Sequence, residues 1–125
     1  DITNNFVYCD KLRLNQVLIN LLGNAVKFTP KEGTITLNMH QEMVAPKGYG
    51  VYIFKVKDTG IGISDEGLER VFERFYREDK ARSRETGGSG LGLSIADYIV
   101  TEHGGTIKAS HNNPKGTIFT IKLPK

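Results

Sequence analysis

Seven of the fourteen glycines in this sequence fall between Gly60 and Gly92, and all of these except Gly67 form two groups. Glycine permits positive φ angles and lets a ligand approach the backbone closely. The first group, Gly60 and Gly62, follows a strand pattern, and the second, which begins at Gly87, leads into a helix pattern. The backbone at these two places is therefore expected to form tight turns or to contact a ligand.

Composition limits the class of protein. A length of 125 residues fits one domain, and 38% hydrophobic with 25% charged residues argues against disorder. The single cysteine, Cys9, excludes a disulfide framework and a multi-cysteine metal site, and it favours a reducing compartment. No apolar run is long enough for a membrane span or a signal-peptide core, and a net charge of +3 is too weak to indicate nucleic-acid binding.

Hydrophobic periodicity predicts helices interspersed with strands. The expected elements are a short strand at 6–9, a helix capped by Asp10 that runs to about Lys27, strands at 34–43 and 50–58, a short helix capped by Ser64, a helix over about 91–102, and strands at 106–110 and 117–123. Between Arg77 and Ser89 the only aliphatic residue is Ala81, so this stretch is expected to be a mobile loop. One α/β domain over 1–125 is the simplest account.

The first predicted helix carries an apolar arc and a polar row. At 100° per residue, the arc consists of Leu14, Val17, Leu18, Leu21, Leu22 and Ala25. Asn20, Asn24 and Lys27 follow i, i+4, i+7 spacing along its edge. Two amide oxygens one turn apart and a lysine beyond them suit Mg²⁺ carried by a polyphosphate. For this helix alone, a solvated polar face is the simpler interpretation.

The two glycine segments favour a ligand with an amino group and an anion. Asp58 ends a strand just before Gly60, where its carboxylate can accept a hydrogen bond from an amino group. The second segment precedes a helix, whose free N–H groups can face phosphate. Its order, Gly88-x-Gly90-x-Gly92, lacks the dinucleotide spacing, and no Gly-Lys-Ser/Thr follows, so Rossmann and P-loop sites are rejected. A tight turn or a helix start remains the alternative for each segment.

Taken together, these segments resemble the catalytic, ATP-binding domain of bacterial sensor histidine kinases, within the Bergerat-fold ATPases. Residues 10–30 resemble the N box of that family, 58–64 its G1 box, 72–77 its F box and 88–93 its G2 box, in the family's order. His103-Gly104-Gly105 and the closing Gly116-Thr117 also match. The resemblance implies an α/β sandwich in which a mixed sheet packs against about three helices, with a flexible ATP lid.

The resemblance also implies a role for each matching position. Asn24, with Asn20 beside it, would hold Mg²⁺, and Lys27 would contact phosphate. Asp58 would accept a hydrogen bond from the adenine amino group, and Phe28 would line the nucleotide site. The other implied nucleotide contacts are Gly60, Gly62, Ile63, Gly88, Gly90, Leu91, Gly92 and Leu93.

The lid is the least specific part of the resemblance. Phe72 and Phe75 would brace it, and one or more of its basic residues would contact the γ-phosphate. Those basic residues are Arg77, Lys80, Arg82 and Arg84. For each of them taken alone, solvated charge is the simpler interpretation.

The implied reaction is transfer of the ATP γ-phosphate to a histidine on a separate dimerisation domain of a two-component sensor kinase. His40, His103 and His111 all lack the phosphoacceptor setting, a His followed by an acidic residue and later a Pro. The chain is therefore expected to bind ATP without its own acceptor and to act with the parent's dimerisation domain and, indirectly, a response regulator. The resemblance further implies a monomeric cytoplasmic domain of a cell-membrane sensor, which does not bind nucleic acid and does not itself insert into the membrane.

An alternative is a Bergerat-fold module with ATPase or nucleotide-sensing activity and no histidine phosphorylation. Gyrase-type and mismatch-repair ATPases of this fold use a Glu base one turn before the helix Asn. The equivalent residue here is Asn20, which cannot abstract a proton. Because a neutral imidazole nitrogen already carries a lone pair and needs less base assistance, Asn20 favours the kinase.

Overall fold

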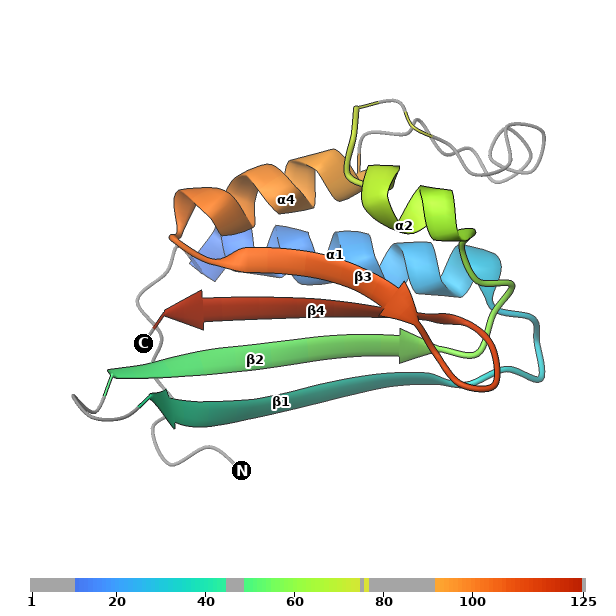
Figure 1. Ribbon diagram of the computed structural model, residues 1–125, viewed down its shortest axis with the longest axis horizontal. Coiled ribbons are helices and arrows are strands. Elements are labelled where there is room, and N and C mark those ends of the chain that lie inside the picture. Colours follow the sequence, from blue (N-terminus) through green and yellow to red (C-terminus); the bar gives the residue numbers. More distant parts are fainter. Residues whose placement is uncertain (1–10, 45–48, 75, 77–91, 125) are drawn as a thin grey trace.

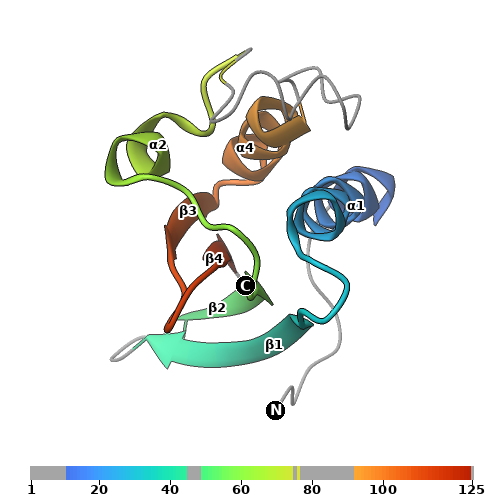
Figure 2. The same cartoon turned by 90° about the vertical axis from the view of Figure 1, so that its right-hand side faces the viewer.

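The computed structural model describes residues 11–44, 49–74, 76 and 92–124. Within them, three helices pack on one face of a four-stranded sheet, which confirms the expected α/β sandwich (Figures 1 and 2). The elements are α1 (Lys11–Phe28), β1 (Ile35–Val44), β2 (Tyr49–Asp58), α2 (Asp65–Arg70), α4 (Gly92–Glu102), β3 (Thr106–His111) and β4 (Thr117–Pro124). No helix among the described residues is both long and apolar enough to span a membrane.

The sheet has the strand order β1-β2-β4-β3. All pairings among the described strands are antiparallel, so these four strands do not supply the parallel pairing of the expected mixed sheet. The short strand expected at 6–9 and its neighbour Asp10 lie outside the described residues. The β1–β2 ladder includes Asp58, opposite Ile35, whereas the β2–β4 ladder ends one residue earlier, at Lys57 and Ile118. Asp58 is thus the point at which β2 leaves β4.

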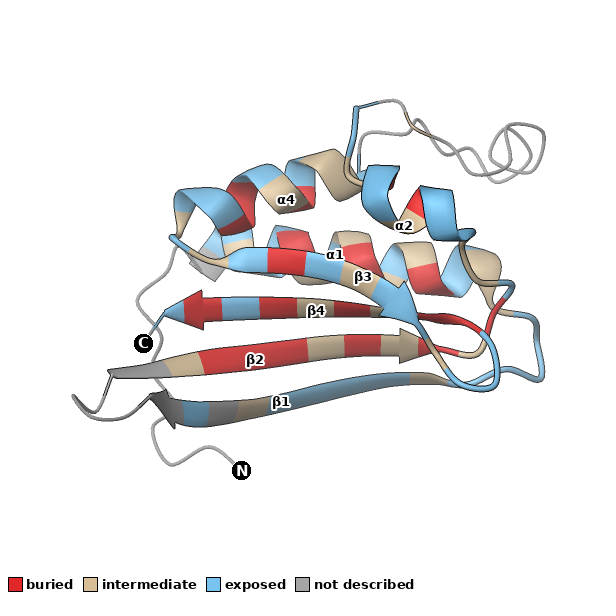
Figure 3. Ribbon diagram, viewed as in Figure 1, coloured by how far each residue is buried: buried red, intermediate tan, exposed pale blue. Residues whose placement is uncertain are grey.

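The core lies between the sheet and the two longer helices, α1 and α4, which run side by side over it (Figures 2 and 3). Val17, Leu21 and Ala25 of the predicted arc are buried, while Leu14 and Leu22 pack partly buried against the same cluster. Burial of this arc sets the rotation of α1. It therefore leaves Asn20 and Asn24 half-buried at the rim of the core.

Helix α2 begins where the sequence predicts. The Ser64 side chain caps it by accepting a hydrogen bond from Gly67 N at 3.0 Å. The helix is short, but apolar residues continue past its end: Val71 is buried, and the ring of Phe72 meets Phe119 edge-on at 6.0 Å. Phe75, which was also expected to brace the lid, lies outside the described residues.

Candidate functional site

The loop after β2 is held directly against the C-terminal end of α1. Ile61 N donates a hydrogen bond to the carbonyl oxygen of Phe28 at 3.1 Å. Gly60 is buried at the same contact, where a Cβ would stand 2.2 Å from the Phe28 oxygen. A side chain at this position would prevent the contact, so the structure requires glycine at residue 60. The sequence pattern alone only suggested this requirement.

Asp58 is 4% exposed and lies at the base of this loop. Its Oδ1 accepts hydrogen bonds from Gly60 N at 2.9 Å and from Thr117 N at 3.2 Å. Within the described part of the chain, no hydrogen bond uses Oδ2. The carboxylate is therefore fixed through one oxygen, and the other can accept a hydrogen bond from a ligand amino group.

The amide row on α1 reaches the start of α4. Asn20 Nδ2 donates to the carbonyl oxygen of Gly92, the first residue of α4, at 3.2 Å. This bond uses the donor end of the amide, and Oδ1 keeps its capacity to accept. Asn24 lies half-buried one turn further along, and Lys27 is exposed in the last turn of the helix.

These contacts bring three of the predicted segments to one region: the C-terminal half of α1, the loop after Asp58, and the start of α4. Gly62 has φ 79°, which a residue with a side chain rarely adopts. Ile63 and Leu93 pack partly buried against the core beside the site. The predicted positions outside the described residues are Arg77, Lys80, Arg82, Arg84, Gly88, Gly90 and Leu91.

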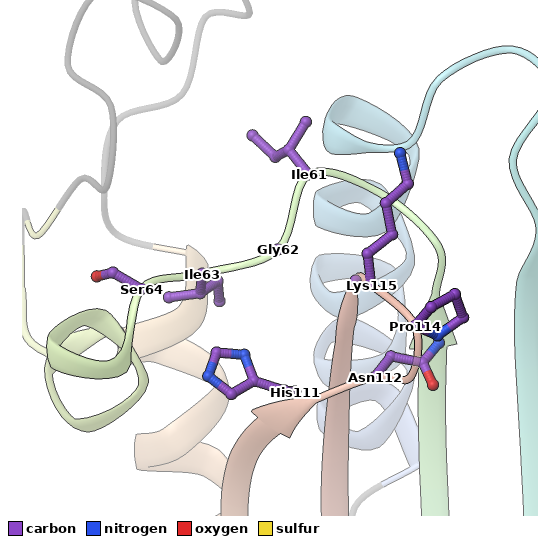
Figure 4. Close-up of a pocket in the computed structure, with 9 residues that line it drawn as sticks. Ile61, Gly62, Ile63, Ser64, His111, Asn112, Pro114 and Lys115 are labelled. Carbon is purple, nitrogen blue, oxygen red and sulfur yellow. The ribbon is translucent and has the colours of Figure 1, made fainter.

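A pocket of about 440 Å³ lies on the side of the loop that faces the β3–β4 turn (Figure 4). Residues 61–64 of the loop form one wall, and residues 111, 112 and 114–116 of the turn form the other. No residue of α1 lines it, so it differs from the region bounded by the amide row.

The β3–β4 turn supplies contacts that sequence reasoning missed. Asn112 Nδ2 donates to the Asp58 carbonyl oxygen at 2.7 Å, and Thr117 N is one of the two donors to the carboxylate. The Gly116-Thr117 pair was visible in the sequence as a closing motif, but no local pattern linked it to Asp58.

The donor set bears on which metal this region can hold. In the part of the chain that the structure describes, no cluster of three or more His, Cys, Asp or Glu residues could hold a metal ion. Asn20 and Asn24 on α1 would offer amide oxygens to a divalent cation. Mg²⁺, which keeps several waters and takes few protein ligands, fits this set.

Comparison with known proteins shows the family to which this sequence belongs. Residues 9–125 match the model of the histidine kinase-, DNA gyrase B- and HSP90-like ATPase family. The chain is 45% identical over 123 residues to the sensor histidine kinase WalK of Bacillus subtilis, covering 95% of this chain and 19% of WalK. It is 44% identical over 117 residues to the sensor protein CiaH of Streptococcus pneumoniae, covering 94% of this chain and 25% of CiaH. The chain thus spans a quarter or less of these two relatives.

Solved structures agree with the sequence comparison. The catalytic domain of the histidine kinase ThkA superposes with a TM-score of 0.78 at 33% identity, covering 99% of this chain and 75% of that structure. A mycobacterial sensor histidine kinase, MprB, gives a TM-score of 0.76 at 32% identity, covering 92% of this chain and 72% of that one.

Proposed function

Because the chain belongs to the family of histidine kinase-, DNA gyrase B- and HSP90-like ATPases, we propose that it binds Mg-ATP and donates the γ-phosphate to a histidine on another domain of a sensor kinase. The buried carboxylate of Asp58 carries the ATP part of this proposal, because its fixed Oδ1 and available Oδ2 suit an amino group on a purine. The histidine part is supported by the relatives, which are named as sensor kinases.

In this proposal the adenine packs against the loop that follows β2. Asp58 accepts the hydrogen bond from its amino group, and Gly60 and Gly62 keep the backbone close to the base. Phe28 and Ile63 supply apolar surface at the edges. Gly60 leaves no room for a Cβ, and Gly62 has a φ of 79°, so a side chain at either position would disturb this loop.

The phosphates would extend along α1 toward the start of α4. Asn20 and Asn24 would hold Mg²⁺ through their amide oxygens, and Lys27 would contact phosphate. When bound, the cation neutralises negative charge that develops on the transferred phosphoryl group. Gly92 and Leu93 stand at the far edge of this path, since Asn20 is hydrogen-bonded to Gly92.

The phosphoacceptor would lie outside this chain. His103 Nδ1 is 2.8 Å from the Ile99 carbonyl oxygen, and His111 Nε2 is 2.6 Å from Asp65 Oδ1. His40 lies on β1, with Nε2 3.7 Å from a Glu42 carboxylate oxygen. Each histidine thus has a local partner, in keeping with a structural role. A dimerisation domain of the parent protein is the proposed acceptor, and a response regulator its onward partner, on the cytoplasmic side where ATP is available.

The alternative, nucleotide hydrolysis or sensing without transfer, has weaker support. Hydrolysis by this fold needs a base that activates water, and the residue one turn before Asn24 is Asn20. Its amide already donates to Gly92 O, and an amide cannot take up the proton. Transfer to an imidazole nitrogen avoids this requirement.

Incubation of the full-length protein that contains this chain with γ-³²P-labelled ATP tests the proposal. We expect label on a histidine outside residues 1–125, stable to alkali and lost in acid, as phosphohistidine is. The isolated chain should bind Mg-ATP and remain unlabelled. Release of inorganic phosphate without labelled protein would favour the alternative, and absence of nucleotide binding would overturn both.

A further inference from the structure

The β3–β4 turn holds the Asp58 peptide at the place where the sheet ladder stops. The last β2–β4 pair is Lys57 with Ile118, so the next residues, Asp58 and Thr117, do not continue the ladder. Instead, Thr117 N donates to the Asp58 carboxylate at 3.2 Å, and the Asn112 amide donates to the Asp58 carbonyl oxygen at 2.7 Å. On the side that faces β4, bonds that involve side chains therefore replace the backbone pairing, while Asp58 stays paired with Ile35 of β1.

Asn112 uses all of its polar groups in this arrangement except its own carbonyl. Its backbone N–H donates to Gly116 O at 3.0 Å and closes the turn. Its side-chain Oδ1 accepts from Asn113 N at 2.9 Å, while Nδ2 donates to Asp58 O. Because one end of the amide faces an N–H and the other a carbonyl, the partners dictate its orientation. Asn112 is thus a rigid bridge from the turn to Asp58.

Gly116 confines the same carbonyl from a second side. Its φ is 111°, and a Cβ at this position would stand 1.9 Å from Asp58 O. The turn backbone can approach Asp58 this closely only because residue 116 is glycine. The Asp58 peptide is held between the Asn112 amide and the Gly116 backbone.

A pocket of about 440 Å³ lies between the turn and the loop residues Ile61–Ser64, with His111, Asn112 and Pro114 on the turn side (Figure 4). The contacts described above hold the Asp58 peptide and its carboxylate. Among these, Asn112 is the only described side chain that donates to the Asp58 backbone.

We infer that Asn112 is a positioning residue for base selection: by fixing the Asp58 peptide, it aims the carboxylate at the amino group of the purine. The inference rests on the proposed function, because it assumes that Asp58 receives that amino group. Asn112 itself is not required to touch the nucleotide.

The turn has a second anchor, which should keep it in place when the Asn112 amide is changed. His111 Nε2 lies 2.6 Å from Asp65 Oδ1 at the start of α2. This contact and the β3–β4 ladder, which runs from Thr106–Lys122 to His111–Thr117, do not involve the Asn112 side chain. Asn112→Asp and Asn112→Ala should therefore fold.

The test compares ATP with purine riboside 5′-triphosphate, which lacks only the 6-amino group. In the unchanged chain, ATP should bind more tightly, and the ratio of the two affinities measures the bond to Asp58. Asn112→Asp places an oxygen against the Asp58 carbonyl, and we expect this ratio to fall about tenfold, the effect of losing one charge-assisted hydrogen bond. Affinity for purine riboside triphosphate should be unchanged.

Asn113→Ala is the matched control, because it removes an amide from the same turn while Asn113 contributes only its backbone N–H to Asn112. Its ratio should equal that of the unchanged chain. An equal loss of affinity for both nucleotides in Asn112→Asp would overturn the inference, because a merely structural role predicts that result. If the unchanged chain does not prefer ATP, the proposed function fails instead.

A second measurement needs no nucleotide. The amide protons of Gly60 and Thr117 both bond to Asp58 Oδ1, so their NMR chemical shifts report the position of the carboxylate. In Asn112→Ala both should move, and in Asn113→Ala neither should. Unchanged shifts in Asn112→Ala would overturn the inference.

Discussion

At the residue scale, the proposed role of Asp58 in recognising the base depends on the asymmetry of its two oxygens. Oδ1 is occupied by Gly60 N and Thr117 N inside the protein, and the side chain is buried from water. Because the residue is largely buried, a hydrogen bond made by Oδ2 would form with little competition from water.

Asp58→Asn should weaken ATP binding while the fold survives. The amide oxygen can keep both bonds from Gly60 N and Thr117 N, but an NH₂ group replaces the oxygen that would accept from adenine. We expect a loss of about tenfold to a hundredfold in affinity, equivalent to roughly 1.5–3 kcal/mol. Calorimetric titration with Mg-ATP measures it.

Glu69→Gln is the control for this prediction, because it removes an exposed carboxylate on α2. It should leave the affinity unchanged. If Asp58→Asn bound Mg-ATP as tightly as the unchanged chain, the assignment of Asp58 to the base would be wrong.

At the element scale, α1 both builds the core and presents the amide row. Its apolar arc predicted which residues are buried, and this burial decides which way Asn20 and Asn24 face. The cap of α2 and the inward side of α4, with Ala96, Ile99 and Val100 buried, were predictable for the same reason. Each depends on residues within a few turns of one another. Predicted and observed boundaries differ by a residue or so, as is usual at element ends.

Leu21→Ala should lower the free energy of unfolding by about 2–5 kcal/mol, because Leu21 is fully buried and the change leaves a cavity. Leu12→Ala offers a matched comparison on the same helix, since Leu12 is 78% exposed, and should change stability by less than about 0.5 kcal/mol. Urea denaturation followed by circular dichroism measures both. Similar losses in the two variants would mean that α1 is not rotated as described.

At the scale of the whole molecule, the proposed site is assembled from segments that fold together. The loop after β2 bonds to the end of α1, α1 bonds to the start of α4, and the β3–β4 turn bonds to Asp58. A ligand that contacts several of these segments binds the folded chain and not the unfolded one. Binding should therefore stabilise the whole fold.

Mg-ATP should raise the unfolding temperature, and the added stability should grow with the logarithm of the nucleotide concentration above the dissociation constant. At a hundred times the dissociation constant, linkage gives about 2.7 kcal/mol of added stability. Differential scanning calorimetry with increasing Mg-ATP measures the shift, and Asp58→Asn should show a smaller shift at the same concentration. An equal shift in both proteins would indicate that the nucleotide stabilises the chain at some other place.

The sequence by itself determined the elements, the buried arc of α1, and the order of motifs that resembles a histidine kinase catalytic domain. These follow from short-range spacing, which a linear sequence displays. Only the tertiary structure decided what surrounds Asp58: the Phe28 carbonyl against Gly60, the Thr117 N–H on the carboxylate, and the Asn112 amide, 54 positions away in the chain, on its carbonyl. These contacts join residues that are far apart in the chain, at separations that no helix or strand periodicity predicts. They form only once β2, β4 and α1 have packed.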